Sequence, residues 1–105
     1  MTESTTTQRF AAACDVPTTH GSRYLQQLCK HWGHKFAVSF TAEAGTVELP
    51  DGARLAMKAG AEGLGLRLDA ASEAALEQMK GVVERHLDRF AFREAPLAFR
   101  WSAAA

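Results

Sequence analysis

The fold is decided by residues 35–68, KFAVSFTAEAGTVELPDGARLAMKAGAEGLGLRL. Apolar residues in this stretch alternate with polar or small residues, and a period of two is typical of strands that bury one face. The alternation is interrupted at Gly45, at Pro50-Asp51-Gly52 and at residues 60–63. The Pro-Asp-Gly sequence is typical of a turn, because proline fixes one backbone dihedral angle and glycine accepts a positive one. The pattern therefore predicts an antiparallel meander of four strands, at residues 35–41, 46–49, 53–59 and 64–68.

Stripes of apolar residues at helical spacing lie on both sides of this stretch. In an α-helix, residues at i, i+3, i+4 and i+7 share one face, so each stripe predicts a helix with one face toward the core. The first stripe consists of Leu25, Leu28, Cys29 and Trp32. The second stripe consists of Leu76, Met79, Val83, Leu87 and Phe90.

Residues with capping chemistry mark the ends of these helices. We expect Thr18 or Thr19 to begin the first helix, because a hydroxyl oxygen accepts a bond from an unpaired N–H group of the first turn. Asp69 or Ser72 is expected to begin the second helix for the same reason. Gly33 is expected to end the first helix in the left-handed conformation, which glycine adopts without strain.

Two shorter alternating segments, residues 8–14 and 97–101, lie near the ends of the chain. Their apolar residues fall on one side: Phe10, Ala12 and Cys14 in the first, and Leu97, Phe99 and Trp101 in the second. They predict a first and a last strand, which gives the element order β-α-β-β-β-β-α-β. Because each helix has one apolar stripe, both helices are expected to pack on a single face of the sheet. The predicted fold is a two-layer α+β fold with an antiparallel sheet.

One core and one exposed sheet face follow from this packing. A chain of 105 residues is too short for two independent cores, so we expect one domain at residues 8–102, between a disordered tail at 1–7 and a tail at 103–105. The predicted core contains Leu25, Leu28, Trp32, Phe36, Val38, Phe40, Leu66, Leu76, Met79, Val83, Leu87, Phe99 and Trp101. The opposite sheet face is predicted to expose Ser39, Glu48, Arg54, Lys58, Arg67 and Arg100.

The composition limits the classes of function. Twelve basic residues balance twelve acidic ones, so no long-range field attracts nucleic acid or an anionic membrane, and we expect neither as a partner. No apolar run approaches the roughly 20 residues that a spanning helix needs. The N-terminus lacks the basic and apolar segments of a secretory signal, so a cytoplasmic location is expected. In that compartment Cys14 and Cys29 are expected to be free thiols.

The segment RYLQQLCKHWGHKF, residues 23–36, concentrates groups that bind metals. Cys29, His31 and His34 have a spacing that resembles a metal site, but Cys29 and His31 lie about 200° apart around a helix and cannot meet on one ion. His31 and His34 would converge only if the helix continued beyond its expected end, with His86 as a third ligand. The alternative is that His31 is a favourable cation at a helix C-terminus and His34 a surface residue. We predict no metal site.

The segment RHLDRFAFRE, residues 85–94, places three arginines along one helix edge: Arg85, Arg89 and Arg93. Such a row can hold phosphate or carboxylate, since each guanidinium presents a rigid fork of donors. The alternative is that these cations favour a helix C-terminus and pair with Asp88 and Glu94. His86 lies near the apolar stripe, so it is expected to be a partly buried core histidine rather than a proton shuttle.

No motif for nucleophilic catalysis, phosphate binding by a glycine loop or zinc binding by paired Cys-x-x-Cys is present. We therefore favour a binding or accessory module without a cofactor over an enzyme. The expected ligand is an anionic small molecule, held by Arg23, Tyr24, Lys30, His31, His34, Lys35, His86, Arg89 and Arg93.

Two alternatives to a ligand-binding module stay open. A small enzyme would rely on histidine acid–base chemistry, because only histidine titrates near neutral pH without a large shift. An interaction module or homodimer would use the outer sheet face, where small residues allow close approach of a partner: Ala37, Ala56, Gly65 and Ala98.

The segments at 23–36 and 85–94 resemble those of a bacterial family known as domain of unknown function 2218, and the resemblance extends over about residues 9–101. It implies no role for any residue. Members of that family are sometimes joined to, or encoded beside, siderophore-interacting flavin reductases, so the resemblance implies iron handling by association and a flavin reductase as a partner. The element order is also similar to the TATA-binding-protein-like and helix-grip folds, in which helices lie on a curved antiparallel sheet.

Overall fold

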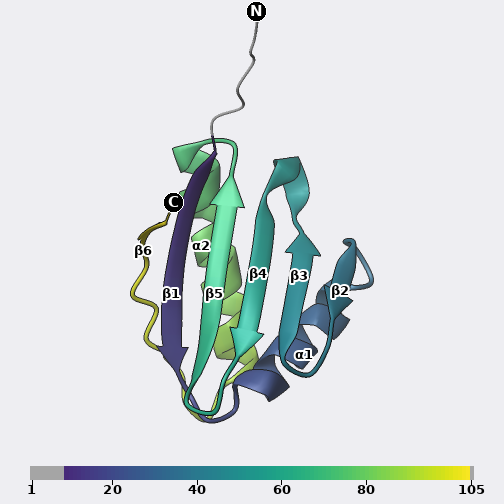
Figure 1. Cartoon of the computed structure of the whole chain (residues 1–105), viewed down its shortest axis with the longest axis vertical. Coiled ribbons are helices and arrows are strands. Elements are labelled where there is room, and N and C mark those ends of the chain that lie inside the picture. The colour runs from purple at the N-terminus through teal and green to yellow at the C-terminus, as the bar shows by residue number, and fades with distance from the viewer. Residues whose placement is uncertain (1–8, 105) are drawn as a thin grey trace, which may run out of the picture.

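Strands from both ends of the chain extend the meander into one sheet (Figure 1). The computed structural model describes residues 9–104, so the expected N-terminal tail lies outside the described residues. The elements are β1 Phe10–Pro17, α1 Gly21–Trp32, β2 Val38–Phe40, β3 Ala44–Glu48, a short 3₁₀ turn Pro50–Gly52, β4 Arg54–Ala59, β5 Gly63–Ala70, α2 Glu73–Phe90 and β6 Ser102–Ala104.

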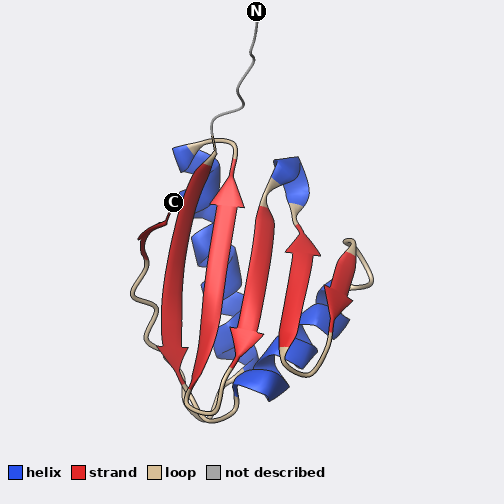
Figure 2. Cartoon of the chain, in the orientation of Figure 1, coloured by secondary structure: helices blue, strands red, loops and turns tan. Residues whose placement is uncertain are grey.

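The six strands are ordered β2-β3-β4-β5-β1-β6, and every neighbouring pair is antiparallel. The four-stranded meander is thus confirmed, and β1 joins it by pairing with β5 along its whole length, from Phe10 opposite Ala70 to Pro17 opposite Gly63. Both helices cover the same face of the sheet (Figure 2). The predicted two-layer α+β fold is confirmed.

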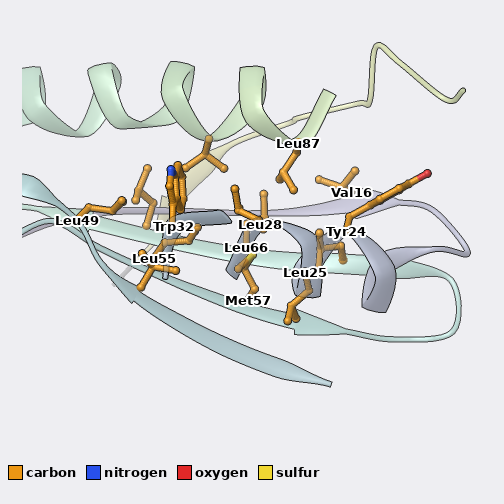
Figure 3. Close-up of a cluster of buried hydrophobic side chains, with 14 of the residues drawn as sticks. Val16, Tyr24, Leu25, Leu28, Trp32, Leu49, Leu55, Met57, Leu66 and Leu87 are labelled. Carbon is orange, nitrogen blue, oxygen red and sulfur yellow. The ribbon is translucent and has the colours of Figure 1, made fainter. Parts of the chain in front are cut away.

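The core fills the space between the sheet and the two helices (Figure 3). Leu25 and Leu28 of α1, Leu55 of β4 and Leu87 of α2 have no exposed surface. Burying one such side chain contributes roughly 1.5 to 3 kcal/mol. Both helical stripes and the inward residues of the inner strands were predicted correctly, and the six residues expected on the opposite face are all exposed.

Gly45 does not separate two strands as expected, but lies within β3 beneath α1. A Cβ atom at this position would lie 2.9 Å from the Sγ of Cys29 and 3.3 Å from a methyl group of Leu25. Since α1 therefore lies directly on the backbone of β3, no larger residue fits between them.

The predicted strand positions were wrong at both edges of the sheet. β2 has only three residues, and Phe40, expected in the core, is 36% exposed. As the outermost strand on its side, β2 has a neighbour on one flank only, which leaves this ring uncovered.

The last strand is Ser102–Ala104 rather than residues 97–101, so residues 103 and 104 pair with β1 instead of forming a tail. Two residues of the segment 97–101 donate hydrogen bonds to acidic side chains of α2. The backbone N–H of Leu97 donates to Asp88 (2.8 Å), and the indole N–H of Trp101 donates to Glu84 (2.7 Å). These bonds hold the segment against α2 and keep its apolar residues on the core without a strand ladder.

The capping predictions were right for α2 and wrong for α1. The Ser72 hydroxyl accepts a bond from a first-turn N–H of α2 (3.0 Å). His20 precedes α1 without a side-chain cap, because the Thr18 hydroxyl accepts from the backbone N–H of His20 (3.0 Å), just outside the helix. Gly33 ends α1 in the right-handed conformation, at φ −61°.

Candidate functional site

Most of the candidate ligand-binding residues line one or the other of two hollows in the helical layer. The first, here called the arginine hollow, has a volume of about 210 Å³ and is lined by Arg23, Tyr24, Gln27, Phe90, Phe92 and Arg93. The second, here called the histidine hollow, has a volume of about 240 Å³, and its lining includes His31, Trp32, Lys35, Met79, Val82 and His86. Three candidates line neither hollow: Lys30, His34 and Arg89.

The arginine hollow combines two cations with aromatic walls. Arg23 and Tyr24 come from the first turn of α1, while Phe92 and Arg93 follow the end of α2. Phe92 is 70% exposed, and the Arg93 guanidinium lies over its ring, 5.5 Å from the centroid. The ion pairs within residues 9–104 involve neither Arg23 nor Arg93.

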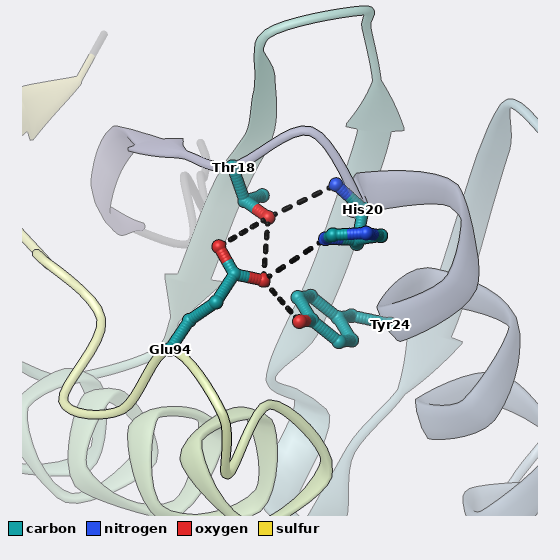
Figure 4. Close-up of polar contacts among 4 residues, drawn as sticks. All are labelled: Thr18, His20, Tyr24 and Glu94. Atoms are coloured by element: carbon teal, nitrogen blue, oxygen red, sulfur yellow. Dashed lines mark hydrogen bonds and ion pairs between the residues drawn. The ribbon is translucent and has the colours of Figure 1, made fainter.

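Asp88 and Glu94, the two carboxylates expected to pair with the arginine row, bond to other groups. Asp88 accepts from the backbone of Leu97. Glu94 lies in a polar cluster with Thr18, His20 and Tyr24 (Figure 4). The alternative in which these acids pair with the arginine row is therefore not the arrangement in the described chain.

Glu94 is the centre of this cluster. Both of its carboxylate oxygens accept from the Thr18 hydroxyl at 3.0 Å, one accepts from the Tyr24 hydroxyl, and Nδ1 of His20 lies 3.3 Å from it. The hydrogen bond from Tyr24 lowers the pKa of Glu94, against the opposing effect of burial, and the bonds from Thr18 and His20 add to the lowering. Burial, followed by the bond to Glu94, raises the pKa of Tyr24. The cluster therefore holds a neutral tyrosine as a fixed wall of the arginine hollow.

The histidine hollow brings together imidazoles from different helices. The ring centroids of His31, on α1, and His86, on α2, are 5.5 Å apart, and His86 lies 5.0 Å from the Trp32 ring. Nδ1 of His86 is 2.7 Å from the carbonyl oxygen of Val82, to which it donates when protonated, leaving Nε2 free to accept. Burial lowers the pKa of His31, and the nearby charges of His86 and Lys35 lower it further. A lowered pKa keeps His31 neutral at pH 7.

The cysteine and histidines of the segment 23–36 do not converge. Cys29 is fully buried in the core, where burial raises the pKa of its thiol to about 11, while His31 faces the histidine hollow and His34 lies outside it. Cys14 and Cys29 are free thiols, as expected. Within residues 9–104, no three side chains among His, Cys, Asp and Glu are grouped to hold a metal ion.

The sequence profile of a family described as "Uncharacterized protein conserved in bacteria (DUF2218)" matches residues 13–102. The chain belongs to this family. The solved structure titled "NMR structure of PA4090 from Pseudomonas aeruginosa" is similar to it, with 34% sequence identity and a TM-score of 0.74, over 89% of this chain and 95% of that chain. No match was found among the curated proteins searched. Neither helix within residues 9–104 has the length and apolar character needed to cross a membrane.

The cluster around Glu94 was missed by sequence reasoning, which treated this residue only as an ion-pair partner. Its hydrogen-bond partners Thr18 and Tyr24 are 76 and 70 positions away in the chain, so no local spacing indicates the contact. A signal was available for Phe92, because an aromatic residue between helix-end cations is unusual for a solvated surface. Met79 was assigned to the core, and its place in the histidine hollow depends on how the two helices are packed.

Proposed function

We propose that this protein is a binding module for a small anion that carries a carboxylate or phosphate group on an apolar or aromatic body. The observation that supports the proposal most strongly is that Arg23 and Arg93 line one hollow without a carboxylate partner in the described chain. Guanidinium groups form charge-assisted, often bidentate bonds with such anions, and these bonds are about twice as strong as bonds between neutral groups.

The walls of the arginine hollow suit the apolar part of such a ligand. Phe90 and Phe92 supply aromatic side chains, and Tyr24 is held in place by Glu94. The volume of about 210 Å³ is below the roughly 300 to 1,000 Å³ of sites for drug-sized ligands. The hollow therefore fits a small aromatic or aliphatic acid, or the charged end of a larger molecule.

A metal chelate with free carboxylates belongs to the same ligand class. It is the member of that class that an association with siderophore-interacting flavin reductases would supply, so a ferric citrate complex belongs in any ligand panel. Such a reductase is then the first protein partner to test.

The test is an NMR titration at low salt with citrate, phosphate, benzoate and ferric citrate, repeated with an Arg23→Gln/Arg93→Gln variant. We expect backbone amide shifts at residues 23–27 and 90–93, a loss of affinity of at least tenfold in the variant, and weaker binding as salt is raised. Lys30→Gln is the matched control, since it removes an exposed cation that lines neither hollow. Equal affinities for the wild type and the double variant would reject the proposal.

Homodimerisation through the outer sheet face is the second candidate. The face without helices carries two further hollows, of about 480 Å³ and 390 Å³, and both are lined by Lys58. A second copy that covers them should give a concentration-dependent dimer in light scattering, and Ala56→Arg should weaken it by obstructing the smaller hollow. A monomer at millimolar concentration would exclude this candidate and leave the ligand proposal unaffected.

A further inference from the structure

The two imidazoles in the histidine hollow are spaced for binding one ion. His31 and His86 come from different helices, and their ring centroids are 5.5 Å apart. With metal–nitrogen bonds of about 2 Å, two imidazoles on the same ion have centroids roughly 5 to 6 Å apart. The observed spacing falls within this range.

His86 has the orientation of a prepared ligand. Its Nδ1 lies 2.7 Å from the Val82 carbonyl oxygen, and a proton on Nδ1 leaves the lone pair of Nε2 available. Metal-binding histidines almost always donate their second ring N–H to a carbonyl or carboxylate, because this bond fixes the tautomer and the ring.

The other groups around the hollow distinguish among metals. Met79 lines the same hollow, and a thioether with imidazoles favours a soft ion such as copper(I). Lys35 also lines it, and the positive charges of Arg89 and His34 act on His31. Cations nearby repel a divalent ion twice as strongly as a monovalent one. The Trp32 ring, 5.0 Å from that of His86, adds an aromatic surface that attracts a cation.

We propose that the histidine hollow binds one copper(I) ion through Nε2 of His86, a ring nitrogen of His31 and the thioether of Met79. This site is separate from the arginine hollow and does not depend on the function proposed for it. Two imidazoles and a thioether provide three ligands.

The test is an anaerobic titration of copper(I) in competition with bicinchoninate, with the histidine ring protons followed by NMR. We expect one equivalent to bind and to shift the ring signals of His31 and His86 but not those of His34. His86→Ala should reduce the affinity at least tenfold, and His34→Ala should leave it unchanged. Met79→Leu should weaken copper(I) binding while zinc(II) binding, measured in parallel, stays the same.

Two further variants identify the atoms that hold the ion. Cys14→Ala/Cys29→Ala should retain the copper, because Cys29 is fully buried and burial raises the thiol pKa of Cys14 to about 12. Arg23→Gln/Arg93→Gln should also retain it. Loss of copper in the cysteine variant, or ring signals of His31 and His86 that do not move in the wild type, would overturn the proposal; the second result requires no substitution that could unfold the chain.

Discussion

The arginine hollow and the histidine hollow lie on the same pair of helices but are held together by different forces. A partly exposed carboxylate, Glu94, organises the first through hydrogen bonds to groups distant in the sequence. Aromatic packing organises the second, where Trp32 is 3% exposed and contacts the ring of His86. The arginine hollow therefore depends on the charge of Glu94, and the histidine hollow depends on the packing of aromatic rings. We expect that each can be altered without the other.

The largest effect is expected from removing the packing beneath the histidine hollow. Trp32→Ala deletes a buried ring and should lower the free energy of unfolding by about 3 to 5 kcal/mol, because a cavity remains. Urea denaturation gives this value. The amide signals of residues 23–27 should keep their positions if the two hollows are independent, and a shift of both regions together would show that they are one unit.

Removing the charge of the polar cluster should have a smaller effect. Glu94→Gln replaces a carboxylate that accepts bonds from three side chains, and we expect a loss of about 2 kcal/mol. Tyr24→Phe, which removes one of these bonds, is the graded control and should cost about 1 kcal/mol. The His86 ring signals should not change in either variant, and equal stability of wild type and Glu94→Gln would contradict the central place of Glu94.

Glu94 and His31 should also affect the stability of the fold in different pH ranges. The pKa of Glu94 is lowered from 4.5 by folding, so its contribution is complete above that pH and is lost as the pH falls through the lower folded value. The pKa of His31 is lowered from 6.5, so the unfolded chain binds this proton more readily and stability falls below pH 6.5. In urea unfolding at a series of pH values, His31→Asn should remove only the upper loss and Glu94→Gln only the lower one.

The smallest effect on stability is expected at the outer wall of the arginine hollow. Phe92 is 70% exposed, so Phe92→Ala should change the free energy of unfolding by less than about 0.5 kcal/mol. Anion affinity should nevertheless fall several-fold, because the ring that supports Arg93 is lost. Unchanged affinity in the NMR titration would show that this ring is not part of the binding surface.

The spacing of apolar residues predicted most of the fold, because it indicates which side of each helix or strand is buried. The meander and both helices follow from it, whereas the edge strand Val38–Phe40 and the terminal strand Ser102–Ala104 do not. The ends of these two strands depend on their neighbours. β2 has a neighbouring strand on one side only, and hydrogen bonds hold Leu97 and Trp101 against α2. Local composition cannot indicate contacts of this kind.

The candidate site was predictable in its residue types but not in its grouping. The cations and histidines were found as clusters along the chain, yet each hollow takes some residues from α1 and some from α2 or the segment after it. Lys30 and His34 belong to the same sequence clusters and line neither hollow. Lys30 is turned away by its position around α1, and His34 lies beyond the end of that helix. Which side chains meet is decided by the packing of the helices and by the polar contacts between distant segments.

The packing of α1 on Gly45 has a consequence for the opposite surface of the molecule. A methyl group at this position would lie 2.9 Å from the Sγ of Cys29, a distance at which something must move. Since α1 supplies Arg23 to one hollow and His31 to the other, an outward displacement of this helix would change the width of both. The side chain of Gly45, a single hydrogen atom, thereby sets the width of two hollows on the helical face without contacting either of them.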